Sequence, residues 1–432
     1  MIPRLEIHFD RDERRLFRKG DAALKGGDGK FLLNHARSGL QLALQALQLP
    51  SKSGVGMMVY NCHTVMNSIC QAGYTPIFVD ITDGMTIDME DLARKRSQMQ
   101  VLIVTHLFGI VNDIKAIKAK YPDLIIIEDC AHCFNHVIDG EMGVYSIGQG
   151  KFPAIGDGGI LVVSPKLPTI DQKLIDGTKT QINTVPEINQ KKYNENTEES
   201  STDTDSILTS LDQQSANEQD SLLTSAQSCS TDTNSQCLSD DSSIKKPKNI
   251  FAEAISEMYN ALPGYGRIGE MKLFMRLWIK AWMYKPGIYN LLTLRLKAKR
   301  MKELKNEGVK EEVVLRKMSR GIANILEEKR KHYAEAVAER IENARVMNER
   351  VKELESEGLI GENAFMLVVR TKDVAGLKEQ FAAKGIETET HFAHCIDWAQ
   401  QFGYELGSCP NAEKLVHELL MVPTYAKLKV KS

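Results

Sequence analysis

The sequence predicts an α/β fold, with a mainly parallel sheet covered by helices and a smaller C-terminal α/β domain. Short apolar runs rich in β-branched residues, such as VLIVTHLFG at 101–109 and LIIIEDC at 124–130, show no alternation of apolar and polar residues. Such runs are typical of strands buried on both faces. Helix-like stretches stand between several of them, as in DMEDLARKRSQ at 88–98. Alternating strands and helices favour a layered α/β architecture.

The individual elements follow the same reasoning along the chain. A helix is expected at 39–49, where Leu40, Ala43, Leu44 and Leu47 share one face. Further strands are expected at 55–61, 75–81 and 159–164 and a further surface helix at 113–121. The C-terminal part predicts one long charged helix over 323–354, a strand at 365–371, and helices at 374–385 and 411–420.

Composition divides the chain into five segments. The 181–248 segment is almost entirely polar, and STDTDS at 201 recurs as STDTNS at 230. Such a segment buries too little apolar area to offset the entropy of ordering, so we expect it to be disordered. The predicted segments are an N-terminal segment (1–30), a large cofactor-binding domain (31–180), a disordered insertion (181–248), a basic aromatic helical insertion (249–310), and a long helix with a small domain (311–432).

Charge and cysteine content exclude several classes of function. The 432 residues carry a formal net charge of −2, which gives no general attraction to nucleic acid. The eight cysteines are scattered, and the first residues lack the apolar core of a secretion signal, so we expect reduced thiols in a cytoplasmic protein. CAHC at 130–133 has no second cysteine pair, and we expect no metal site.

The stretch GQGKFPAIGDGG at 148–159 places Lys151 among glycines. A lysine held close under a cofactor by a permissive backbone suits pyridoxal phosphate (PLP), which also needs an acid for its ring nitrogen and a cradle for its phosphate. Asp129 ends a buried strand and supplies the acid. Arg37 and Ser38 lie at a helix start, where an anion is favoured, and Ser146 lies on the loop that leads to the lysine.

Several motifs in this order resemble the DegT/StrS family of PLP-dependent sugar aminotransferases. The resemblance rests on GYTPIFVDI at 73–81, HLFG at 106–109, IEDCAH at 127–132 and SIGQGKFPAIGDGG at 146–159. It covers roughly 30–165 and 315–425. It implies the PLP-dependent transferase fold of type I, the aspartate aminotransferase architecture.

The resemblance also implies roles for residues of this chain. Lys151 would be the catalytic lysine that bonds PLP, and Asp129 would pair with the ring nitrogen, with His132 beside the cofactor. The family position that stacks on the ring falls on Cys62, with Tyr60 and His63 adjacent, and which of the three covers the ring stays open. The phosphate cradle would comprise Ala36, Arg37, Ser38 and Ser146; contacts to substrate would come from Tyr60, His106, Arg320 and His391.

The implied activity is transfer of an amino group, from glutamate as the expected donor, to a keto group of a nucleotide-linked sugar used in cell-surface glycans. A sugar dehydratase is an alternative, although family dehydratases replace the lysine with histidine. A catalytically degenerate scaffold or regulator is a second alternative. The family echo in LRKMSR at 315–320 implies a homodimer with its active site at the interface.

Residues 267–300 are rich in basic and aromatic side chains. They include nine lysines and arginines but only one acidic residue, Glu270. Lysine, arginine, tryptophan and tyrosine are typical of a membrane–water boundary. Two readings stay open here. The segment forms either amphipathic helices that contact the inner membrane surface peripherally, or a helical hairpin packed on the protein's own domain.

Overall fold

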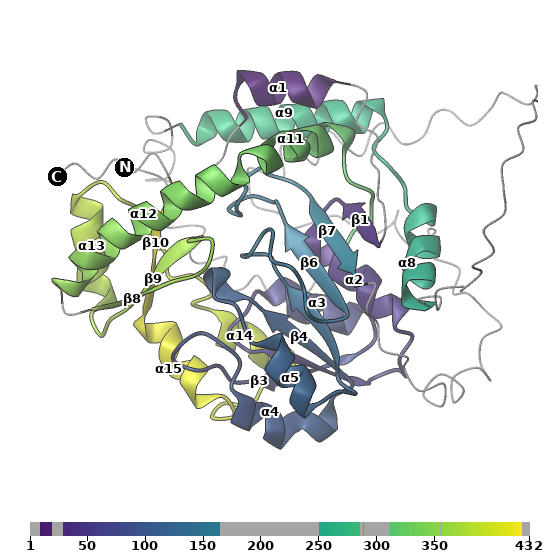
Figure 1. Ribbon diagram of the computed structural model, residues 1–432, viewed down its shortest axis with the longest axis horizontal. Coiled ribbons are helices and arrows are strands. Elements are labelled where there is room, and N and C mark those ends of the chain that lie inside the picture. The colour runs from purple at the N-terminus through teal and green to yellow at the C-terminus, as the bar shows by residue number, and fades with distance from the viewer. Residues whose placement is uncertain are drawn as a thin grey trace, which may run out of the picture. The chain divides into compact units, whose positions relative to one another are not determined.

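The structure is a computed structural model that describes residues 9–19, 29–164, 250–285, 288, 312–354 and 356–425 (Figure 1). The predicted disordered insertion at 181–248 therefore lies outside the described residues, as does most of 286–311. The described residues all belong to one of the two units into which the chain divides.

A seven-stranded sheet forms the centre of the larger part, in the order β1-β7-β6-β5-β4-β2-β3. The five neighbouring strands β3, β2, β4, β5 and β6 run parallel to one another. At the other edge β7 pairs antiparallel with β6, and β1 pairs antiparallel with β7. Almost every residue of the central strands β2, β4 and β5 is buried, as their uninterrupted apolar runs predict. The strands are β1 (Lys30–Leu33), β2 (Gly54–Met58), β3 (Thr75–Val79), β4 (Val101–Thr105), β5 (Ile125–Asp129), β6 (Met142–Ser146) and β7 (Gly159–Val163).

Helices cover both faces of this sheet. α2 (Ala36–Ala46) packs on β6 and β7 and against α3 (His63–Gln71), whereas α4 (Met89–Lys95) and α5 (Ile114–Lys120) lie on the other face (Figure 1). Right-handed crossovers dictate this division, because β2-α3-β3 and β4-α5-β5 progress across the sheet in opposite directions. The predicted α/β layers are confirmed.

The C-terminal part builds a small antiparallel sheet of β8 (Glu357–Ile360), β9 (Met366–Arg370) and β10 (Leu419–Pro423), with β9 in the middle. α12 (Tyr333–Lys352) packs on β8 and β9, and α13 (Val374–Ala383) packs on β10. A separate apolar cluster fills this layer. Between α13 and β10 the chain forms α14 (Cys395–Gln400) and α15 (Pro410–Glu418). Both helices contribute buried residues to the core of the larger part.

The prediction of one long helix over 323–354 is wrong in one respect. The chain forms α11 (Arg320–Lys331) and α12, separated at His332, whose φ of −105° and ψ of 8° leave the helical region. The break turns Tyr333 into the core, where its ring stacks on Phe152 at 4.9 Å and its hydroxyl donates to the carbonyl of Phe134 at 2.9 Å. Sequence periodicity alone does not reveal such a tertiary anchor. The prediction also did not include β1 and β6.

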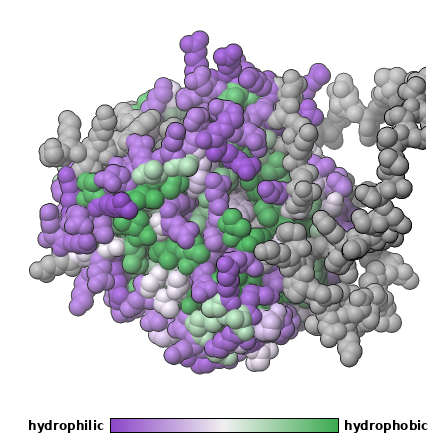
Figure 2. Space-filling model, viewed as in Figure 1, coloured by the Kyte–Doolittle hydropathy of each residue, from purple (hydrophilic) through white to green (hydrophobic). Residues whose placement is uncertain are grey.

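Three helices run beside one another at the upper edge in Figure 1: α1 (Arg11–Arg18), α9 (Arg267–Met283) and α11. α8 (Ile250–Ala261) packs on α2. Figure 2 shows that hydrophobic residues gather in the middle of this face, while mostly hydrophilic side chains cover its upper edge. Among the described residues, no helix is long and apolar enough to cross a membrane.

Candidate active site

The predicted cofactor residues gather where the parallel strands end. Asp129 closes β5, Thr105 closes β4, and Ser146 closes β6 just before the loop that carries Lys151. Residues Tyr60 to His63 follow β2 and lead into α3. Ligand sites in α/β sheets form at these carboxyl ends because the connecting loops there diverge to opposite faces.

Lys151 and His132 make the central contact, with Nζ 2.9 Å from Nε2. The backbone N–H of Phe108 donates to Nδ1 of His132 at 3.1 Å, so a neutral ring carries its proton on Nε2 and donates it to Nζ. Burial lowers the pKa of His132 well below its usual value, and burial likewise lowers the pKa of Lys151. The shift at His132 keeps its ring neutral, and the shift at Lys151 favours the neutral amine, the form of lysine that reacts with an aldehyde.

Aromatic rings hold His132 in place from several sides. Phe365 stacks on it with centroids 4.6 Å apart, Phe108 at 5.4 Å and Phe392 at 5.9 Å. Asn363 also donates to its backbone carbonyl at 2.9 Å. Asn363 and Phe365 lie in the turn before β9 and Phe392 lies in the loop before α14, so the C-terminal part of the chain completes the site.

Asp129 is held by a chain of polar groups that the sequence analysis did not identify. Asn61 Nδ2 donates to Thr105 Oγ1 at 2.7 Å, Thr105 Oγ1 donates to Asp129 at 3.3 Å, and the N–H of Ala131 donates to it at 3.0 Å. Burial raises the pKa of Asp129, while the N–H of Ala131 and the charge of Lys151 oppose that rise. A polar residue at the end of each adjacent parallel strand is the signal that could have revealed Thr105.

The three residues near the expected ring-stacking position have different surroundings. Tyr60 is buried and donates to the carbonyl of His391 at 2.7 Å. His63 meets Trp398 edge to face at 4.9 Å. Cys62 interacts electrostatically with Lys151; burial raises its pKa, but hydrogen bonds involving His63 and Thr64 bring the pKa of the thiol down to about 7. Of these three residues, Cys62 is therefore the one whose charge affects the pKa of Lys151.

The glycines around Lys151 serve the path of its loop. Gly156 and Gly158 have φ of +102° and +111°, in the region that other residues rarely adopt. A Cβ on Gly156 would come within 2.8 Å of Leu277 of α9. Tyr284, which follows α9, also accepts a hydrogen bond at 3.0 Å from Gln149, two residues before the lysine. α9 therefore packs directly on the lysine loop.

The predicted phosphate corner collects positive charge at the start of α2. Arg276 of α9 contacts the buried Asp157 at 2.8 Å, and His35 lies 3.4 Å from the same carboxylate. Burial and the charges of Arg37, Arg276 and Lys280 lower the pKa of His35 to about 3, so this imidazole is neutral. Three cations thus face one carboxylate, which leaves the corner suited to an anion.

Two of the predicted cradle residues show specific arrangements within that corner. Ser38 is fully buried, and its hydroxyl donates to the carbonyl of Val314 at 3.1 Å. An anion at this corner would meet the N-terminal end of α2. Ser146 Oγ accepts from the N–H of Gly148 at 3.4 Å. It retains its own proton for donation.

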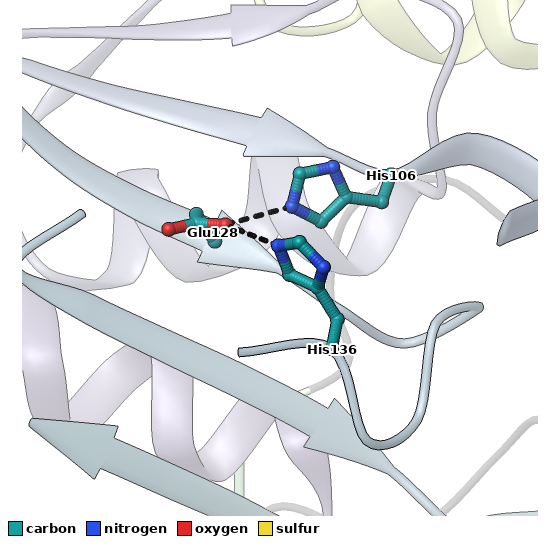
Figure 3. Close-up of side chains that lie close together, drawn as sticks. All are labelled: His106, Glu128 and His136. Atoms are coloured by element: carbon teal, nitrogen blue, oxygen red, sulfur yellow. Dashed lines mark hydrogen bonds and ion pairs between the residues drawn. The ribbon is translucent and has the colours of Figure 1, made fainter. Parts of the chain in front are cut away.

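His106, predicted to contact substrate, is instead part of a buried network (Figure 3). Its Nε2 lies 2.8 Å from Glu128 and its Nδ1 accepts from the N–H of Asn112 at 3.1 Å; His136 reaches the same carboxylate oxygen at 3.1 Å. Both ring nitrogens are occupied and the side chain is inaccessible. The network ties β4, β5 and the following loop together, and contact of His106 with a substrate stays a prediction.

The remaining substrate-side predictions differ in where they lie. His391 reaches the cluster around His132, with ring centroids 5.5 Å apart. Arg320 is exposed at the start of α11, and its backbone N–H donates to Glu270 of α9 at 2.9 Å. The structure thus brings His391, but not Arg320, to the Lys151 site of the same chain.

The donor set fits PLP. A buried amine with a lowered pKa faces a buried carboxylate, and a helix N-terminus with excess positive charge lies at the other end of the same loop. Lys151, Asp129 and the first turn of α2 match the aldehyde, the ring nitrogen and the phosphate respectively.

Comparisons with known proteins agree with this fold. A family pattern described as the DegT/DnrJ/EryC1/StrS aminotransferase family matches residues 23–174 and 293–432. GDP-perosamine synthase of Vibrio cholerae is 24% identical over 192 residues, which are 38% of this chain and 52% of that protein. The chain thus spans about half the length, or less, of the curated relatives it matches.

Solved structures share the fold at low sequence identity. The aminotransferase TlmJ of Streptoalloteichus hindustanus is 15% identical with a TM-score of 0.60, covering 100% of this chain and 95% of that one. DesI, solved in the presence of its TDP-sugar product, is 16% identical with a TM-score of 0.53, covering 97% of this chain and 81% of DesI. With most of its length matched by the family pattern, the chain belongs to the DegT/DnrJ/EryC1/StrS aminotransferase family.

Proposed function

We propose that the protein is a PLP-dependent aminotransferase that moves an amino group from glutamate to a keto group of a nucleotide-linked sugar. The observation that carries the proposal is the contact of Lys151 Nζ with His132 Nε2 at 2.9 Å beside the buried Asp129. Family membership supports the reaction class. The name GDP-perosamine synthase and the TDP-sugar product of DesI support a nucleotide sugar as the acceptor.

Each residue has a separate task in the proposed reaction. PLP, when bound, supplies the electron sink that allows a proton to leave the carbon bearing the amino group. Asp129 holds a proton at the ring nitrogen through charge. Lys151 Nζ moves the proton from and to substrate carbon as general base and acid, and His132 orients that amine. The first turn of α2 with Arg37 binds the phosphate.

The first test identifies the lysine. The protein is loaded with PLP, reduced with borohydride and digested, and the labelled peptide is sequenced by mass spectrometry. We expect the label on Lys151, and Lys151→Ala should bind PLP without a covalent bond and lose transamination. Lys120→Ala, an exposed lysine on α5, serves as the matched control and should retain both. A label on another lysine would contradict the assignment.

The second test identifies the reaction. The loaded protein is incubated with glutamate and a panel of nucleotide keto-sugars, and products are read by mass spectrometry. Gain of an amino group by one sugar supports the proposal. Loss of water without amine gain would identify a dehydratase instead, and failure to take up PLP would identify a scaffold or regulator.

A further inference from the structure

The outward face of α9 carries an apolar stripe formed by Ile268, Met271, Met275, Trp278 and Trp282. These residues are spaced alternately three and four apart, so they lie along one side of the helix. Each is between 41% and 61% exposed. Exposed large apolar side chains are unremarkable singly, but a continuous row on one helix marks a surface that contacts something else.

The opposite side of α9 is fixed to the protein. Leu273 and Leu277 are buried in the main core, and Arg276 reaches Asp157 at 2.8 Å. Glu270 accepts from Ser319 Oγ at 2.6 Å and from the N–H of Arg320 at 2.9 Å, which ties the first turn of α9 to the start of α11. The helix therefore cannot rotate to bury the stripe. Arg276, one of the nine basic residues of 267–300, thus faces the lysine loop.

The surroundings of the stripe are basic. Exposed Arg267 and Lys285 stand at the two ends of α9, whose one acid, Glu270, is occupied by α11. α1 lies beside α9 (Figure 1), joined through Phe274, over whose ring Arg18 sits at 4.7 Å. α1 contributes four arginines, Arg11, Arg14, Arg15 and Arg18.

Acidic groups of α1 are largely engaged within the protein. Asp10 caps the helix by accepting from the N–H groups of Asp12 and Glu13, and Glu13 pairs with Lys329 of α11 at 2.5 Å. The edge formed by α1 and α9 thus presents cations beside apolar side chains, a combination that matches anionic headgroups above acyl chains.

We propose that the stripe and the flanking cations of α1 and α9 dock the protein peripherally on an anionic lipid surface. A second copy of the chain fits this face less well. A two-fold contact through α9 would bring the same arginines and lysines of both copies together, and like charges oppose each other. α9 also lies between the two ranges matched by the family pattern, so the surface is an addition to the shared fold.

The test is co-flotation of the full-length, PLP-loaded protein with vesicles. We expect binding to phosphatidylcholine vesicles that contain phosphatidylglycerol and little binding to phosphatidylcholine alone. Binding should weaken between about 0.01 M and about 0.15 M salt, as the screening length falls from about 30 Å to about 8 Å. Absence of binding to the anionic vesicles at low salt would overturn the proposal.

Variants locate the contact. Trp278→Ser combined with Trp282→Ser should reduce vesicle affinity by about tenfold or more, because two aromatic anchors are lost. Val137→Ser combined with Leu406→Ser removes two apolar side chains elsewhere that are 81% and 66% exposed, and this variant should bind as the unchanged protein does. Both variants should keep their PLP absorbance, because none of the four side chains touches the Lys151 site. Equal loss in both variants would contradict the assignment to α9.

Two further measurements test which partner occupies the stripe. Trp278 and Trp282 are two of the three tryptophans of the chain, and the third, Trp398, is buried. Brominated lipids should therefore quench the fluorescence of the bound protein; unquenched emission would overturn the proposal. If the tryptophan variant instead changes the molar mass in light scattering from dimer to monomer, the stripe is an interface between copies and the lipid proposal is wrong.

Discussion

Burial acts on Lys151 and Asp129 in opposite directions, and each shift suits a different task. Desolvation lowers the pKa of the amine and raises the pKa of the carboxyl, because it penalises the charged form of both. Their mutual attraction acts against both shifts. The amine is thereby closer to its reactive neutral state, while the carboxyl still accepts hydrogen bonds from Ala131 and Thr105 that favour its charge.

Asp129→Asn tests this balance. We expect turnover to fall by about 10²-fold or more, because an amide cannot hold the ring nitrogen protonated by charge. The same change removes a negative charge that raises the pKa of Lys151, so the pH at which covalent PLP attachment reaches half its maximal rate should move lower. Stopped-flow absorbance across pH measures that midpoint.

The control for this change is Asp139→Asn, a surface carboxylate that pairs with Lys115. It should leave both turnover and the midpoint unchanged. Near-normal turnover of Asp129→Asn, or a midpoint that moves to higher pH, would contradict the role assigned to Asp129.

At the scale of elements, the buried network of Glu128 fixes the ends of the strands that position the site. One carboxylate oxygen meets His106 after β4 and His136 after β5, and the other accepts from the N–H groups of Asp139 and Gly140 at 2.7 and 2.6 Å. Asp129 is the next residue on β5. The network thus fixes the position of the loop that leads to His132.

Glu128→Gln should lower the free energy of unfolding at neutral pH by about 3 kcal/mol, because it leaves buried partners without their charge. Burial raises the pKa of Glu128, but hydrogen bonds from His106, His136 and Gly140 outweigh it and bring the pKa to about 2, below the usual 4.5. The unfolded chain therefore binds the proton first, and the stability that Glu128 contributes above pH 4.5 is lost as pH falls toward 2.

Urea unfolding at about pH 7 and about pH 3 measures both effects. The difference between the unchanged protein and Glu128→Gln should shrink at the lower pH. Glu357→Gln, an exposed carboxylate on β8, provides the control and should be neutral at both. A difference that grows on acidification would contradict the assigned sign.

At the scale of the whole molecule, the position of Arg320 bears on assembly. It lies exposed at the start of α11 and not at the Lys151 site of its own chain. The family resemblance implies that the segment LRKMSR at 315–320, which ends at Arg320, serves the site of a partner subunit. A homodimer with shared active sites therefore stays a prediction, and two-fold assemblies are the commonest kind.

Subunit mixing tests that prediction. Lys151→Ala and Arg320→Ala should each be inactive alone, whereas hybrids formed by dissociating and reassociating the two should regain part of the activity, since one site receives both intact residues. Light scattering should give a dimer mass throughout. A fully active monomer, or hybrids without activity despite subunit exchange, would contradict a shared site.

The sequence by itself determined the buried strands, the surface helices between them, and the lysine, aspartate and helix start that together indicate PLP. These features are local, because apolar periodicity and glycine spacing are visible in a linear chain. Tertiary structure decided which candidates meet. It placed His391 beside His132, withdrew His106 into the Glu128 network, broke the long helix at His332, and turned Arg276 toward Asp157. The physical reason is that a side chain's partners come from other segments of the chain. Only the packing of those segments fixes which partners the side chain meets.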